Sequence, residues 1–230
     1  MKKIRVLKIC FEQEIPSREI PRLRGAIIEK TGRDKILFHN HIGESGLRYS
    51  YPLIQYKVIE RKGCLICLDE GTDEIHSFLG QRNWDIQLGE QKMTLTIDSL
   101  AANNFTLNVW DKKFTYSIYK WLALNEENYK KYEEVTTLAE KTLFLEKILT
   151  GNILSFAKGV GYNVEKNFEV HIKQIQRDYF AKYKGTGLQA FDLIFRTNFF
   201  LPDYIGLGKG VSTGFGVIKS IHPRITEHES

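Results

Sequence analysis

The segment KIRVLKICF, residues 3–11, alternates polar and apolar side chains, which is typical of a β-strand with one face in a core. A helix is predicted to follow it, because Ser17 can cap a helix start and Gly32 can end one. Apolar residues recur at helical spacing between these two positions. This strand and helix begin the α+β unit that decides the fold of the first half.

The other elements of the first half complete a strand-helix-strand-strand-helix-strand order, which is that of a ferredoxin-like domain. The pattern predicts extended segments at 35–41 and 47–59, a strand at 64–71, a helix at 73–81 and a strand at 92–100. We therefore expect an N-terminal ferredoxin-like domain over residues 1–100 and a domain boundary at 101–104.

Residues 105–224 are predicted to form a second domain of similar composition. Its expected elements are strands at 105–110 and 114–122, helices at 126–150 and 152–159 on either side of Gly151, strands at 168–184 and 188–200, and a last strand after a glycine-rich loop. Two similar half-domains fit this order. The predicted fold class is α+β, with antiparallel sheets and helices packed on one face.

The composition indicates a folded protein with a mildly basic surface. Of the 230 residues 42% are hydrophobic, and Lys+Arg 33 against Asp+Glu 28 gives a formal charge of +5. No apolar run approaches the ~20 residues of a membrane span. The N-terminus has no unbroken apolar stretch of the kind a signal peptide needs. We therefore expect a cytoplasmic protein with no membrane partner.

The basic residues are unevenly distributed, which bears on the kind of partner. They crowd the first strand and helix and recur in the C-terminal half, whereas acids gather at 69–74 and 126–146. Such asymmetry favours a face that binds a polyanion. An ordinary solvated surface explains it equally well, so charge alone does not decide.

The three cysteines are too few for a disulfide scaffold. Cys64 and Cys67 have C-x-x-C spacing, but a zinc ribbon needs a second pair and a redox dithiol needs a cysteine at a helix start. Both lie in a predicted apolar strand. We expect them to be core residues.

The clearest candidate for chemistry is the pair His39 and His41. Imidazole can take and give a proton near neutral pH, and an extended segment would place both rings on one face. A turn at 43–46 would bring Arg48 and Tyr49 back toward them. The alternative is a surface pair without a role, and a metal site is disfavoured because no supporting ligand lies at a suitable spacing.

A second candidate site is the loop GLGKGVSTGFG, residues 206–216, in which five glycines can expose backbone N–H groups to phosphate. It is neither a P-loop nor a dinucleotide fingerprint, because the required spacing or the following helix is missing. A tight structural connection is an equal alternative. The candidate phosphate-contacting residues of this loop are Gly206, Gly208, Lys209, Gly210, Ser212, Thr213, Gly214 and Gly216.

Taken together, several motifs resemble the CRISPR-associated repeat-cleaving endoribonucleases of the repeat-associated RNA-binding class. They are RLRGA (22–26), FHNH (38–41), YPLIQYK (51–57), LTGNILSFAKG (149–159) and NFFLPDYIGLGKGVSTGFG (198–216). The resemblance spans nearly the whole chain. The glycine-rich loop is shared by the wider class, whereas the histidine pair with PLIQYK is typical of one subgroup.

The resemblance implies two tandem ferredoxin-like (RRM-like) domains and metal-independent cleavage of CRISPR precursor RNA within its repeats. By the motif match, His39 and His41 are the catalytic residues, and Arg24 and the residues of loop 206–216 contact RNA. No cofactor is implied. The implied partners are precursor and mature guide RNA, a second copy of the chain, and a CRISPR effector complex.

The expected chemistry uses the 2′-hydroxyl of RNA as the nucleophile, so that one base and one acid are needed. A cation should stabilise the charged phosphorane. Candidates for positioning substrate and transition state are Lys30, Lys35, Arg48 and Tyr49. Products should carry a 5′-hydroxyl and a 2′,3′-cyclic phosphate. The alternatives are a non-cleaving RNA-binding subunit of the same class and a metal- or nucleotide-using enzyme.

Overall fold

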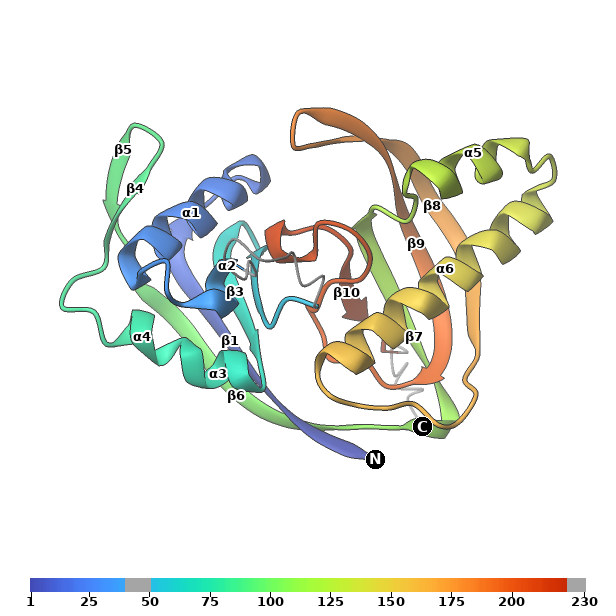
Figure 1. Cartoon of the computed structure of the whole chain (residues 1–230), viewed down its shortest axis with the longest axis horizontal. Helices are drawn as coiled ribbons and strands as arrows, with labels where there is room; N and C mark the ends of the chain where they lie inside the picture. Colours follow the sequence, from blue (N-terminus) through green and yellow to red (C-terminus); the bar gives the residue numbers. More distant parts are fainter. Residues whose placement is uncertain (40–50, 223–230) are drawn as a thin grey trace, which may run out of the picture.

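The computed structural model describes residues 1–39 and 51–222, which form two α+β halves side by side (Figure 1). Each half contains one four-stranded antiparallel sheet. The predicted fold class is confirmed.

The first half has the sheet order β2-β3-β1-β6, which is the strand order of a ferredoxin-like domain. Its helix α1 lies between the first two strands in sequence, and the hairpin β4–β5 is an addition to the basic unit. The elements are β1 Lys2–Glu14, the 3-10 turn η1 Ser17–Glu19, α1 Ile20–Thr31, α2 Ile36–His39, β2 Ile54–Ile59, β3 Lys62–Leu68, α3 Glu70–Glu74, α4 His76–Leu79, β4 Asp85–Leu88, β5 Gln91–Thr94 and β6 Ile97–Leu107.

The second half repeats this order as β10-β7-β9-β8. The elements are β7 Val109–Trp121, α5 Glu126–Glu134, α6 Leu138–Gly159, β8 Val170–Tyr183, β9 Thr186–Phe199, the 3-10 turn η2 Val211–Thr213 and β10 Val217–Ser220. Between β9 and β10, where a ferredoxin-like unit has its second helix, lie the glycine-rich loop and η2. Figure 1 shows this loop between α1 and α2 on one side and α6 and β10 on the other.

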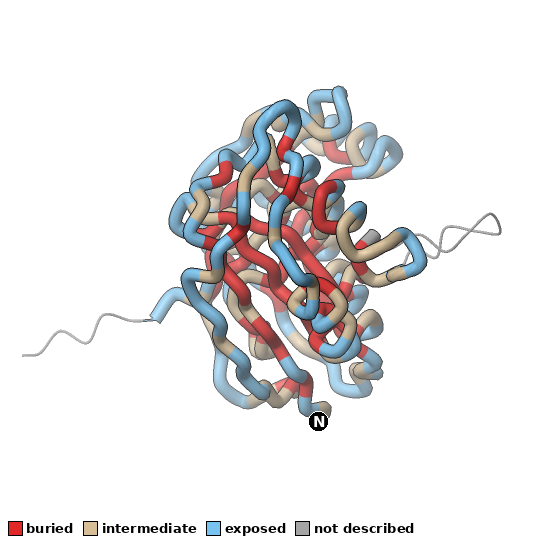
Figure 2. Tube along the Cα trace, turned by 90° about the vertical axis from the view of Figure 1, so that its left-hand side faces the viewer, coloured by how far each residue is buried: buried red, intermediate tan, exposed pale blue. Residues whose placement is uncertain are grey.

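Strand β1 shows why the two halves pack as one body. Leu7, Ile9 and Phe11 share a core with α1, whereas Val6 and Cys10 point to the opposite face and share a core with the second half. The first sheet is therefore covered on both faces. Figure 2 shows the buried residues along the inner strands and the exposed ones at the turns.

Two predicted elements differ in the structure, and the predicted domain boundary falls inside a strand. Residues 35–41 were expected to be extended, but 36–39 form α2, which places Phe38 in the core. The expected boundary at 101–104 lies inside β6, which pairs with β1 as far as Leu107. The expected break at Gly151 does not occur, because α6 continues through it and buries Leu149 and Ile153 on either side.

Cys64 and Cys67 are buried in β3, as expected. Cys64 is also bonded to Cys10, its register partner on β1 and 54 residues away in sequence. This bridge was not predicted, because sequence spacing alone does not reveal which strands are neighbours. Among the described residues, no helix is both long and apolar enough to cross a membrane.

Candidate functional site

The backbone of the predicted catalytic segment is described only as far as His39, the last residue of α2. The side chain of His39 and the residues His41, Arg48 and Tyr49 lie outside the described part of the chain. Their catalytic roles stay predictions. Because 36–39 are helical, the argument that a strand places both imidazoles on one face does not apply.

Arg24 of α1 lies beside this segment. Its Nε donates a hydrogen bond to the Phe38 carbonyl, with 3.3 Å between the two atoms. Burial lowers the pKa of its guanidinium, and the nearby phenols of Tyr56 and Tyr183 act in the opposite direction. Arg24 was predicted to bind RNA. The structure places it at the end of α2, where it holds the backbone next to His39.

Lys30 and Lys35 are engaged with other parts of the first half. The Lys30 amine donates to the Asn83 side chain (2.7 Å) and to the Asp85 carbonyl (2.9 Å). The Lys35 amine lies 4.0 Å from a carboxylate oxygen of Glu74. Their proposed action on the transition state stays a prediction.

No cluster of three or more His, Cys, Asp or Glu side chains suited to a metal ion occurs in the described residues.

The glycine-rich loop packs mainly against other residues of the same chain. A Cβ at Gly216 would overlap the Leu207 backbone, whereas a Cβ at Gly214 would meet nothing nearer than the Tyr56 carbonyl, 3.6 Å away. Both glycines have positive φ, at 62° and 88°. Gly216 is therefore required by internal packing, and Gly214 has room for a small side chain.

This difference predicts unequal effects of alanine at the two positions. Gly216→Ala should lower the free energy of unfolding by roughly 2–5 kcal/mol, through overlap and backbone strain together. Gly214→Ala should cost about 1–2 kcal/mol, from its left-handed backbone alone. Urea unfolding of the two variants measures both values. Equal losses would mean that backbone conformation, not packing, sets the need for glycine here.

A cleft of about 960 Å³ opens beside the loop. Residues 208–212 form one wall, the tip of the β8–β9 hairpin a second, and Tyr51 and Pro52 part of a third. Tyr51 and Pro52 come directly after the segment 40–50 that carries His41. The cleft thus brings the glycine-rich loop next to the end of the predicted catalytic segment.

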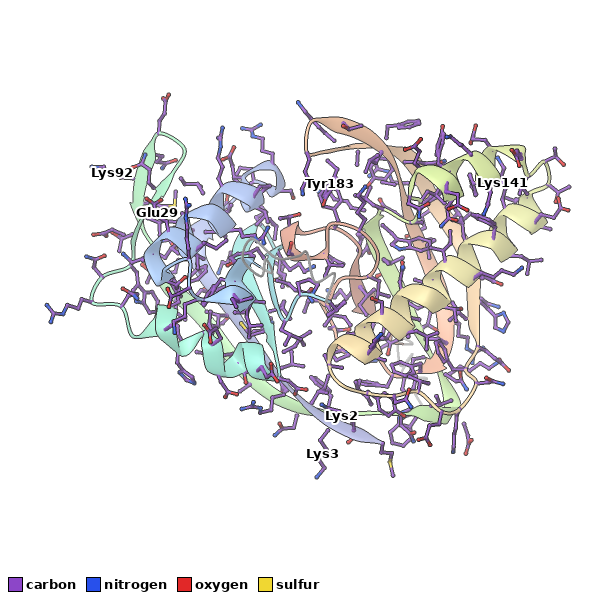
Figure 3. The ribbon with its side chains drawn as sticks, in the orientation of Figure 1. Lys2, Lys3, Glu29, Lys92, Lys141 and Tyr183 are labelled. Atoms are coloured by element: carbon purple, nitrogen blue, oxygen red, sulfur yellow. A yellow bond between two sulfur atoms is a disulfide. The ribbon has the colours of Figure 1, made fainter. Side chains whose placement is uncertain are left out.

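Tyr183 is the aromatic group of this cleft. Its ring meets Phe215 of the loop edge-on, with 5.4 Å between centroids, and the amines of Lys184 and Lys209 lie 5.7 and 5.5 Å from its centroid. Figure 3 shows Tyr183 between the hairpin and the loop. Two cations beside an aromatic ring suit contacts with a phosphate backbone and a base. Tyr183 therefore lines the cleft where an unpaired base can stack on its ring.

A second groove, of about 450 Å³, lies near β10 and the turn between β2 and β3. Its lining includes Arg18, Lys120, Lys182 and Lys219, with Glu60 as the acidic residue among them. Lys120 occupies a break in the β7–β9 register and has a positive φ of 52°. Four basic side chains therefore line one groove.

Two family models together match almost the whole chain. The one described as the Cas6b N-terminal domain matches residues 2–106, and the one described as the Cas6b C-terminal domain matches residues 108–221. The chain belongs to the Cas6b family. The resemblance found in the sequence, to CRISPR repeat-cleaving endoribonucleases, is confirmed.

Solved structures agree with the Cas6b assignment. One described as a crystal structure of Cas6b is 26% identical with a TM-score of 0.86 and covers 96% of this chain and 100% of that chain. Another, described as the CRISPR RNA processing endoribonuclease Cas6b, is 25% identical with a TM-score of 0.74 over the same shares. An uncharacterized protein from Methanocaldococcus jannaschii is 44% identical over 101 residues, 44% of this chain and 67% of that protein.

Sequence reasoning missed the polar residues of β2 that face the loop, Gln55 and Lys57, although both lie in the quoted PLIQYK motif. Both are fully buried. A signal was present, since a strand that alternates Ile54, Gln55, Tyr56 and Lys57 has one polar face. That pattern is normally interpreted as a solvent-facing side.

Proposed function

We propose that this Cas6b-family chain cleaves CRISPR precursor RNA within its repeats and releases guide RNAs. The observation that carries the proposal is the match of both Cas6b domains over nearly the full length. The cleft supports it, because Lys184, Lys209 and Tyr183 lie beside the glycine-rich loop in the same cleft that Tyr51 and Pro52 line. Cations of this kind bind phosphates, and aromatic rings stack on unpaired bases.

In the proposed mechanism the 2′-hydroxyl upstream of the scissile phosphate attacks the phosphorus. One of His39 and His41 takes the hydroxyl proton, and the other protonates the departing 5′ oxygen. The products carry a 2′,3′-cyclic phosphate and a 5′-hydroxyl. Arg24 contributes by holding the Phe38 carbonyl, which fixes the backbone from which His39 extends.

We further propose that RNA enters across the cations of the cleft and that binding weakens as salt rises. Pairing with a second copy of the chain and association with a CRISPR effector complex belong to the same proposal. A non-cleaving RNA-binding subunit is the second candidate, because the lysines of the cleft and of the second groove suit RNA binding whether or not the RNA is cut. Incubation with repeat RNA separates the two candidates, since the product ends are diagnostic.

Cleavage is expected to continue in excess EDTA, because the substrate supplies the nucleophile and the histidines supply the acid and the base. The measurement is a gel of repeat RNA cut with and without chelator, with product ends identified by phosphatase and kinase treatment. A metal-dependent nuclease serves as the control that the chelator acts. Activity lost in EDTA and restored by magnesium or zinc would contradict metal independence.

A further inference from the structure

Strand β2 faces two cores. Ile54 and Tyr56 pack with α1 in the core of the first half, whereas Tyr51 and Leu53, just before the strand, point into the core shared with the second half. Gln55 lies on this second side, as does Lys57, and neither exposes any surface. Two polar side chains thus occupy the buried junction between the halves.

Three of the hydrogen bonds at this junction form a closed ring. The Gly206 N–H donates to Oε1 of Gln55 at 2.9 Å, Nε2 of Gln55 donates to the Tyr51 hydroxyl at 2.9 Å, and that hydroxyl donates to the Gly206 carbonyl at 2.7 Å. Both backbone groups of Gly206 are therefore held by side chains of the first half. Tyr51 is itself fixed by its edge-on contact with Phe156 of α6, with 5.3 Å between ring centroids.

The Lys57 amine holds the other end of the same stretch of loop. Nζ donates to the Val211 carbonyl at 2.7 Å. A Cβ at Gly206 would lie 2.7 Å from this Nζ, so the missing side chain leaves space for the amine. Residues 206–211 therefore lie around Lys57. At each end of this stretch a backbone group forms a hydrogen bond with a β2 side chain, Gly206 with Gln55 and Val211 with Lys57.

The Lys57 amine is costly to bury. Desolvation lowers its pKa from 10.5 to about 7, and no acidic group among residues 1–39 and 51–222 offsets that shift. An apolar side chain of similar volume is often neutral or stabilising where a charge is buried. Stability therefore does not account for the amine, whereas a directed bond to one carbonyl fixes the position of the loop.

We propose that Tyr51, Gln55 and Lys57 are positioning residues for the RNA-binding loop. They set the place of residues 206–211 relative to the half that carries His39, so that bound phosphates meet the histidines at one fixed separation. This inference rests on the proposed RNA-cleaving function. Its physical basis is that small misplacements of a substrate cost much of the rate of a positioned reaction.

The test compares Tyr51→Phe, Gln55→Leu and Lys57→Met with the unchanged protein. Lys62→Met is the matched control, because it makes the same substitution at a partly exposed lysine that begins the neighbouring strand β3 and forms an ion pair with Asp98 of β6. Two quantities are measured: hydrogen exchange of the amides in 206–216, and the single-turnover rate with all repeat RNA bound. Both are taken well below the unfolding temperature of each variant.

We expect faster exchange confined to the loop, and a saturated cleavage rate about tenfold lower, in all three variants. Lys62→Met should match the unchanged protein. A merely stabilising role would leave the saturated rate intact, so an unchanged rate with unchanged loop exchange overturns the inference. If Lys57→Met does not fold, Tyr51→Phe decides, since it removes one oxygen and keeps the ring on Phe156.

Failure of the proposed function is a separate outcome. If the unchanged protein neither binds nor cuts repeat RNA, the cleavage rates of the variants cannot be compared. Hydrogen exchange alone then reports whether the three side chains hold the loop in place. Faster loop exchange in the variants would then still support positioning of the loop, and unchanged exchange would refute it.

Discussion

Replacing His39 with alanine, and separately His41, should lower the single-turnover cleavage rate by about 10²–10⁴-fold each, which is the usual contribution of one proton-transfer group. Affinity for repeat RNA should change little, because most of it comes from phosphate contacts that neither histidine provides. The measurement is a rate at saturating protein beside a binding titration with the same RNA.

His76→Ala is the matched control for this experiment. His76 begins α4 in the same half of the molecule and is exposed on the surface. It should cleave at the normal rate. A double variant of His39 and His41 with full activity would falsify the site assignment, and loss of RNA binding together with cleavage would give the pair a structural role instead.

Much of the fold could be predicted from local pattern. The alternation in residues 3–11 predicts β1, and both of its faces are buried as a central strand requires. The helical stripe of α6 was also predicted, but Gly151 was expected to end it. A glycine inside a helix costs only about 1 kcal/mol. Burial of Leu145, Leu149, Ile153 and Phe156 on one side of α6 outweighs that cost.

The segment around Phe38 shows where local pattern misleads. An apolar, aromatic stretch predicts an extended chain, yet one turn of helix buries Phe38 against α1 and lets Arg24 bond its carbonyl. The helical conformation of 36–39 is thus favoured by packing against α1, which lies earlier in the chain. The sequence of 35–41 by itself contains no information about that packing.

The glycine-rich loop shows that contacts between distant parts of the chain cannot be predicted from one segment. The loop could be identified from its amino-acid sequence, but the structural reason for each glycine could not. Gly216 is needed because the Leu207 backbone passes beside it, and Gly206 because the Lys57 amine does. The polar face of β2 could not be told from a solvent-facing one, since the second half of the chain covers it.

The identity of the nucleophile yields the second large effect. A single 2′-deoxy substitution just upstream of the scissile phosphate should stop cleavage altogether, because the attacking oxygen is absent. Binding should barely change, because one hydroxyl is a small part of a contact dominated by phosphates and bases. The deoxy RNA should therefore compete with normal repeat RNA, and its inhibition constant should match the dissociation constant of the normal repeat.

The matched control carries the deoxy sugar one nucleotide further upstream, where no attack occurs, and should be cut normally. An enzyme that activates water would cut both RNAs and leave a free 3′ end. For the RNA with the deoxy sugar next to the scissile phosphate, attack by the 2′-hydroxyl thus predicts no cleavage product on a gel, whereas attack by water predicts one. Cleavage of the first deoxy substrate would remove the need for a base acting on the 2′-hydroxyl, and with it the roles proposed for His39 and His41.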